Sequence, residues 1–236
     1  MELTFATGAE GAIPLHVVEQ DGVDGWLSAQ PERVASWVRA AGFTGAMGKV
    51  LLVPGENGRL ENAVVGYGTP EARARGRFHL AAAAGSLPEG TYRFEGLPED
   101  RAEEEALGWL LAGYVFDRYR GQTSPAARLA APEGVDAVRL EAVAAGECLT
   151  RDLINTPAND LGPAELAEAA KKLAEKHGAK FKVTVGDALL KNDFPMIHAV
   201  GRASDRAPRL IDFTWGPARA PKVTLVGKGI CYDTGG

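Results

Sequence analysis

The amino-terminal hundred residues alternate short apolar runs with turn residues, a pattern typical of strands separated by loops and helices. It predicts strands at 12–18, 49–54, 62–67 and 91–94. The last of these has the character of an edge strand. A helix is predicted over 31–41, because Pro31 stands in its first turn and Gly42 follows its end. Strands interleaved with helices favour an α/β domain with a mixed sheet.

A longer helical pattern follows at 103–119, with acidic residues in its first turn and Gly121 beyond its end. The segment 121–134 then contains Pro, Gly and Ser, as linkers between domains often do. We therefore expect a domain boundary near residue 130, which gives an amino-terminal domain at 1–130 and a second domain at 131–236.

The second domain again mixes the two periodicities. Its pattern predicts helices at 135–153 and 163–176, and strands at 181–185, 197–200, 210–214 and 222–226. The last strand has the continuous apolar character of a buried strand. We expect an α/β domain with a mainly parallel sheet, whose strands bring functional groups to their carboxyl ends.

Composition is that of a folded soluble protein. Of the 236 residues, 45% are hydrophobic and 24% are charged, and the formal net charge is −5. No basic block is long enough to follow a phosphate backbone, so no nucleic-acid partner is expected. The nearest candidate comprises Arg73, Arg75 and Arg77, which we interpret as a solvated surface cluster.

The compartment expected from the sequence is the cytoplasm. Cys148 and Cys231 are the two cysteines, too few for a disulfide-stabilised secreted domain. The first ten residues lack the basic start and apolar run of a signal peptide. No stretch approaches the ~20 apolar residues that a membrane span requires.

The strongest chemical signal is a lysine between two glycines, followed five residues later by an aspartate. A phosphate-binding loop is excluded for Gly227-Lys228-Gly229, because Ser or Thr must follow the lysine and a glycine must stand five positions before the first glycine. A metal site is one interpretation, in which a neutral Lys228 amine and the Asp233 carboxylate bind divalent ions. Both could reach ions ~3.5–4 Å apart only if the strand ends or bulges near Gly229. A solvent-facing lysine with a turn aspartate is the alternative.

Three motifs resemble a known family. Residues 226–236, Val-Gly-Lys-Gly-Ile-Cys-Tyr-Asp-Thr-Gly-Gly, closely resemble the signature of the leucyl aminopeptidases, the cytosolic two-metal enzymes. Residues 151–161, Arg-Asp-Leu-Ile-Asn-Thr-Pro-Ala-Asn-Asp-Leu, and 200–204 followed by 208–210 are similar to two further segments of that family, in the same order. Cys231-Tyr232 departs from the commoner Thr-Phe.

The resemblance implies a macro-like amino-terminal α/β domain followed by the beginning of a catalytic domain. It implies that Lys228 and Asp233 are metal ligands, with Asp233 bridging two divalent ions, Zn²⁺ or Mn²⁺. The implied reaction removes an amino-terminal, leucine-like residue from a peptide by a metal-activated water. The implied assembly is a homohexamer.

The family's other carboxylate ligands, its second active-site lysine and its arginine lie downstream of the position that matches Gly236. The sequence therefore offers no catalytic residue besides the two predicted ligands, and we expect the chain alone to bind the ions poorly and to be inactive. The alternative is a non-catalytic, macro-like binding or assembly module.

Overall fold

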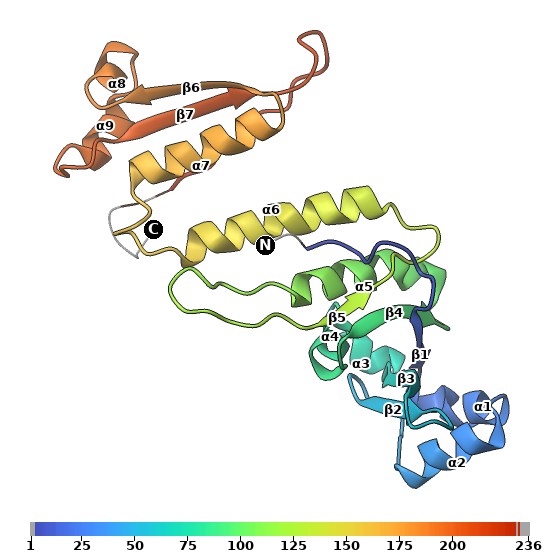
Figure 1. The fold of residues 1–236 in the computed structure, drawn as a ribbon. Coiled ribbons are helices and arrows are strands. Elements are labelled where there is room, and N and C mark those ends of the chain that lie inside the picture. The colour runs from blue at the N-terminus through green and yellow to red at the C-terminus, as the bar shows by residue number, and fades with distance from the viewer. Residues whose placement is uncertain (1–2, 230, 232–236) are drawn as a thin grey trace. The chain divides into compact units, whose positions relative to one another are not determined.

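A five-stranded sheet is the frame of the first of two compact units, which divide between residues 150 and 151 in this computed structural model. The structure describes residues 3–229 and residue 231. The strand order is β2-β3-β1-β4-β5, and all pairs are parallel except β2 with β3 (Figure 1). The strands are β1 (Ile13–Val18), β2 (Val50–Pro54), β3 (Leu60–Gly66), β4 (Gly90–Glu95) and β5 (Ala127–Leu129). The mixed sheet predicted for this half is thus confirmed, and most of its strand pairs are parallel.

β4 is not an edge strand, which corrects the prediction for 91–94. The short strand β5 pairs beside it, with Tyr92 opposite Leu129. Three residues are too few to produce a recognisable alternation of apolar and polar positions. The edge strand on this side of the sheet is β5, which the sequence pattern does not predict.

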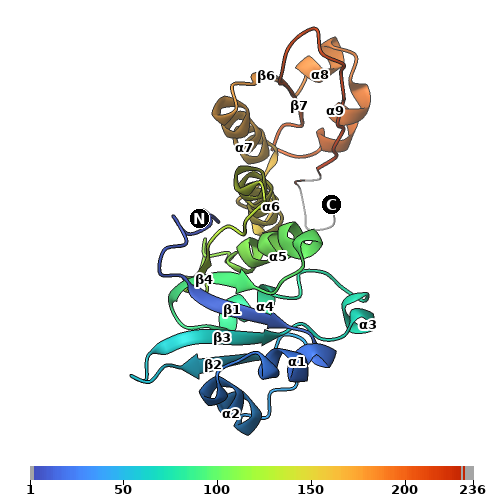
Figure 2. The same ribbon diagram turned by 90° about the vertical axis from the view of Figure 1, so that its right-hand side faces the viewer.

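Helices cover both faces of this sheet (Figures 1 and 2). Val18, Val53 and Val64 pack with one pair of helices on one face, whereas Leu15 and Val17 face a larger core on the other. Successive residues of a strand point to opposite faces, so β1 contributes to both cores. The pair on the first face is α1 (Val23–Ser28) and α2 (Glu32–Ala40), preceded by the short 3₁₀ turn η1 (Gln20–Gly22). The larger core takes residues from α4 (Ala81–Ser86), α5 (Glu99–Ala112) and α6 (Ala137–Asn155), and the short α3 (Pro70–Arg73) precedes α4.

The helix predicted at 103–119 is displaced toward the amino terminus. It begins at Glu99, directly after Pro98, and ends at Ala112. Gly113 is the C-cap, and the β-branched and aromatic residues that follow it favour a helix less. The acidic first turn is therefore Glu99 and Asp100.

The second unit, described to residue 229 and at 231, contains one long helix over a two-stranded sheet. The helix α7 (Pro163–Lys176) has the predicted bounds and contacts both strands, β6 (Lys180–Val185) and β7 (Arg209–Thr214). These strands pair antiparallel, with Val183 opposite Ile211. A parallel pair is therefore not found among the described residues of this unit. Two short helices join the strands, α8 (Ala188–Lys191) and α9 (Pro195–Gly201).

Two strand predictions in the second unit are wrong. Residues 197–200 belong to α9, which Pro195 starts at its first position. Residues 222–226 have no regular structure, and Val223, Leu225 and Val226 are 82%, 91% and 91% exposed. A strand requires a neighbour for its backbone hydrogen bonds, and in the described part of this unit β6 and β7 pair with each other.

Candidate metal-binding segment

The Gly-Lys-Gly segment lies against the first turn of α7. A Cβ atom placed on Gly229 would stand 3.1 Å from Cδ2 of Leu166 and 3.8 Å from Sγ of Cys231. A Cβ on Gly227 would meet no heavy atom within 4 Å. The first glycine therefore lies in open space, and the second allows a close approach to the helix.

Lys228, between these glycines, is exposed, and no described residue forms a hydrogen bond or ion pair with its amine. Asp233 lies outside the described residues. Within the described ranges no group of three or more His, Cys, Asp and Glu side chains could hold a metal ion. An accessible amine suits a metal ligand, but it is the one predicted ligand with a described position.

Cys231 is partly buried beside α7. Burial raises the pKa of its thiol, and the nearby carboxylate of Glu165 raises it further. The thiol form is therefore favoured at neutral pH, which disfavours a nucleophilic role. Cys148 is buried in the core of the first unit, as expected of a small apolar residue.

The first turn of α7 is fixed by two side chains. Glu165 accepts a hydrogen bond from the backbone N–H of Gly162 at 3.0 Å, which caps the helix. Arg206 donates from Nη1 to the carbonyl oxygen of Ala158 at 2.5 Å and from Nη2 to that of Asn159 at 2.6 Å. The sequence did not indicate Arg206, because its partners lie 48 and 47 positions away in a loop.

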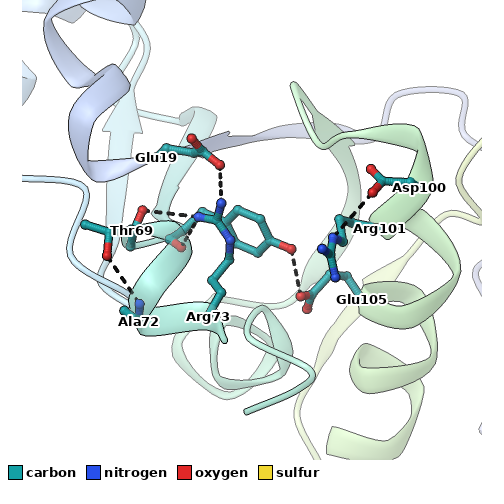
Figure 3. Close-up of polar contacts among 9 residues, drawn as sticks. Glu19, Thr69, Ala72, Arg73, Asp100, Arg101 and Glu105 are labelled. Atoms are coloured by element: carbon teal, nitrogen blue, oxygen red, sulfur yellow. Dashed lines mark hydrogen bonds and ion pairs between the residues drawn. The ribbon is translucent and has the colours of Figure 1, made fainter. Parts of the chain in front are cut away.

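In the first unit, the polar groups near the carboxyl ends of β1 and β3 are already paired (Figure 3). Arg73 forms an ion pair with Glu19, donates to the carbonyl oxygens of Tyr67 at 3.0 Å and Gly68 at 3.2 Å, and stacks 4.4 Å above the Tyr67 ring. Its side chain is 16% exposed, so the prediction of a solvated surface arginine is wrong at this position. The backbone carbonyls to which it donates are not visible in a charge pattern.

The buried carboxylate of Glu105 also has a partner, because it accepts a hydrogen bond from the Tyr67 hydroxyl. Burial and this carboxylate raise the pKa of Tyr67. Ligands of open α/β sheets bind outside the carboxyl ends of the strands. Here the chain's own side chains bind one another at that edge.

None of the helices in the described residues is both long and apolar enough to cross a membrane.

Comparison with known proteins matches two family models in consecutive order. The M17 aminopeptidase amino-terminal domain matches residues 13–132, and the catalytic domain of the cytosol aminopeptidase family matches residues 148–236. The second match includes both predicted metal ligands.

Individual relatives agree with this assignment. A protein named "Probable cytosol aminopeptidase" from Brucella ovis is 34% identical over 87% of this chain and 46% of its own length. The crystal structure of cytosol aminopeptidase from Coxiella burnetii is 34% identical, with a TM-score of 0.87 over 97% of this chain and 50% of that one. The bottromycin maturation enzyme BotP in complex with Mn is 26% identical, with a TM-score of 0.66 over 87% of this chain and 45% of that one.

The chain thus spans about half the length of the relatives it matches. Its fold is that of their amino-terminal domain followed by the start of their catalytic domain. On these grounds the chain belongs to the cytosol aminopeptidase family, M17.

Proposed function

We propose that this chain is the part of a metal-dependent aminopeptidase that carries its first two metal ligands, Lys228 and Asp233. The whole enzyme would release leucine-like amino-terminal residues from peptides. The observation that carries this proposal is the catalytic-domain match over residues 148–236, which contains both side chains. The exposed amine of Lys228 supports it, because a ligand must be accessible to an ion.

Each ligand has a role that its own chemistry allows. Lys228 would donate the lone pair of a neutral amine, and the carboxylate of Asp233 would share its two oxygens between two ions. Gly227 and Gly229 carry no side chain that could crowd the amine. When bound, two divalent ions supply Lewis acidity toward the peptide carbonyl and an activated water.

Zn²⁺ and Mn²⁺ are the proposed ions. The structural relative BotP was solved in complex with Mn, which supports manganese as one of them. We propose that the chain by itself binds ions weakly and is inactive, since two ligands do not complete the coordination of two metals.

We further propose a cytoplasmic, homohexameric assembly with peptides as its substrates. The relatives are named cytosol aminopeptidases, which supports the location. The hexamer rests on the resemblance stated above.

The proposed domain boundary remains near residue 130. The amino-terminal family match ends at residue 132, which supports this position. The helix α6 that follows nevertheless contributes Leu140, Ala144 and Cys148 to the core of the first unit. Residues 127–130 also lie inside that unit, because β5 pairs with β4 and Ala130 is buried.

Leucine p-nitroanilide hydrolysis tests the proposed function. The chain should give no turnover with added Mn²⁺. The native gene product, if its intact mass exceeds 24.9 kDa, should hydrolyse the anilide and lose activity on chelation. A native product of 24.9 kDa without turnover would favour the binding or assembly module instead.

A further inference from the structure

The segment that carries Lys228 packs on the first turn of α7. Arg206 contacts the N-cap of this helix and binds the loop that precedes it. We propose that Arg206 is a positioning residue for the described part of the metal-binding segment, residues 227–229 and 231. This inference rests on the proposed role of Lys228 as a metal ligand, and it concerns a residue that lies outside every motif of the sequence.

Arg206 binds the loop before α7 through two hydrogen bonds. Two nitrogens of one guanidinium donate to two consecutive carbonyls, Ala158 and Asn159, at 2.5 and 2.6 Å. A planar fork fixes both carbonyls at once, which a single ammonium cannot do. The backbone N–H of Arg206 also donates to the Ser204 hydroxyl at 3.1 Å, which orients the arginine itself.

The Arg206 guanidinium also lies against Gly162, the N-cap residue of α7. Gly162 is buried, and a Cβ atom there would collide with Nη1 of Arg206 and lie 3.0 Å from Oε2 of Glu165. The arginine therefore lies directly on the N-cap residue. Its position depends on glycine at 162, and the direction in which α7 begins depends on both residues.

Leu166 connects the start of α7 to the metal-binding segment. Leu166, whose backbone N–H donates to the Gly162 carbonyl at 3.0 Å, is the side chain on which Gly229 packs. A Cβ atom placed on Gly229 would also lie 3.8 Å from Sγ of Cys231. Gly229 thus lies against this helical turn, and Lys228 is its immediate neighbour in the chain.

The thiol of Cys231 reports on this contact without any metal. In the 236-residue chain, Arg206→Ala should raise the rate of iodoacetamide labelling of Cys231 by roughly fivefold, because the segment loses its support. Labelling of Cys148, which is buried in the core of the first unit, should not change in the same sample, which shows that the first unit remains folded. The exposed Arg202→Ala is the matched control and should leave both rates as in the wild type.

Two further variants make the test independent of one substitution. Arg206→Lys should give an intermediate rate, since lysine can hold one carbonyl in the same direction. Gly162→Ala should reproduce the effect of Arg206→Ala by displacing the guanidinium. If Arg206→Ala exposes both cysteines, the Arg206→Lys variant replaces it in the test. In that variant, labelling of Cys231 faster than in the wild type, with Cys148 still protected, supports the proposal.

Unchanged labelling of Cys231 in Arg206→Lys and in a folded Arg206→Ala or Gly162→Ala would overturn it. Titration with Mn²⁺ gives a second measurement, which a general change in stability would not alter. The affinity for Mn²⁺ should fall roughly fivefold in Arg206→Ala and remain as in the wild type in Arg202→Ala. An equal affinity in the two variants would also overturn the proposal. If Mn²⁺ binding by the wild type is too weak to measure, as two ligands alone would allow, the labelling rates decide the role of Arg206 and anilide hydrolysis by the native gene product decides the proposed function.

Discussion

The hydroxyl of Tyr67 donates a 3.0 Å hydrogen bond to the carboxylate of Glu105, a residue 38 positions later in the chain and 1% exposed. The other oxygen of the same carboxylate accepts from the backbone N–H of Leu80 at 2.8 Å. One buried side chain of α5 therefore joins the end of β3 to the start of α4. A buried carboxylate is tolerated when its oxygens accept hydrogen bonds, as both oxygens of Glu105 do.

Removing this carboxylate should cost much of the stability of the first unit. Glu105→Ala leaves the Tyr67 hydroxyl and the Leu80 N–H buried without that acceptor, and we expect the free energy of unfolding to fall by about 2–4 kcal/mol. Urea denaturation followed by tryptophan fluorescence measures the change. Glu103→Ala on the same helix, which removes an exposed pair with Arg139, should change stability by less than about 0.5 kcal/mol. Equal losses in the two variants would contradict a central role for Glu105.

Tyr67→Phe should cost less than Glu105→Ala, about 1 kcal/mol, because the carboxylate keeps its bond to Leu80. The double variant should lose less than the sum of the two single variants, since both remove one shared hydrogen bond. Strict additivity in the same urea series would mean that the two residues do not act together.

Gly66→Ala should destabilise the first unit by about 3 kcal/mol or more. A Cβ at this position would collide with the backbone of Gly45 and Ala46, which cannot turn aside as a flexible side chain could. Gly25→Ala is the matched control, because a Cβ there meets nothing within 4 Å and lies in a helix. The control should stabilise the chain by about 0.5–1 kcal/mol. A Gly66→Ala variant as stable as the wild type would show that the close approach is not present in solution.

Acidification should destabilise the first unit through His16. Burial lowers the pKa of His16 below its ordinary value of 6.5, against the opposing effect of Glu95. The unfolded state therefore binds a proton first as the pH falls, so the stability contributed by neutral His16 is complete above pH 6.5 and is lost as the pH falls through the lowered pKa. In His16→Gln, the free energy of unfolding between pH 7 and about pH 5 should fall less steeply than in the wild type. Parallel curves would contradict this account.

Periodicity predicted most of the elements in this chain and none of the contacts that hold them. α7 has its predicted bounds because Pro163 starts it and Gly178 follows its end, two local signals. β5, with three residues, and the role of Arg206, whose partners are distant, carry no local signal. The apolar run at 222–226 reads as a buried strand, yet such a run becomes a strand only when another strand pairs with it.

The candidate site divides in the same way. A lysine between two glycines drew attention to Lys228, but the residues alone left a solvent-facing lysine open, and the predicted ligand role came from the family resemblance. That Gly229 rests on Leu166, and that Arg206 supports this turn, depends on tertiary contacts. The resemblance suggested the ligands, which remain a proposal, and the fold was needed to find the residues that contact their segment.

Lys228 and Asp233 are proposed to bind the same divalent ion. In the chain labelled with ¹³Cε-lysine, added Mn²⁺ should broaden the Lys228 resonance before those of the other lysines, since paramagnetic broadening detects even weak binding. Asp233→Asn should abolish this selectivity, and Lys228→Arg identifies the signal. Broadening that is uniform among the lysines, or that is unchanged in Asp233→Asn, would contradict the claim.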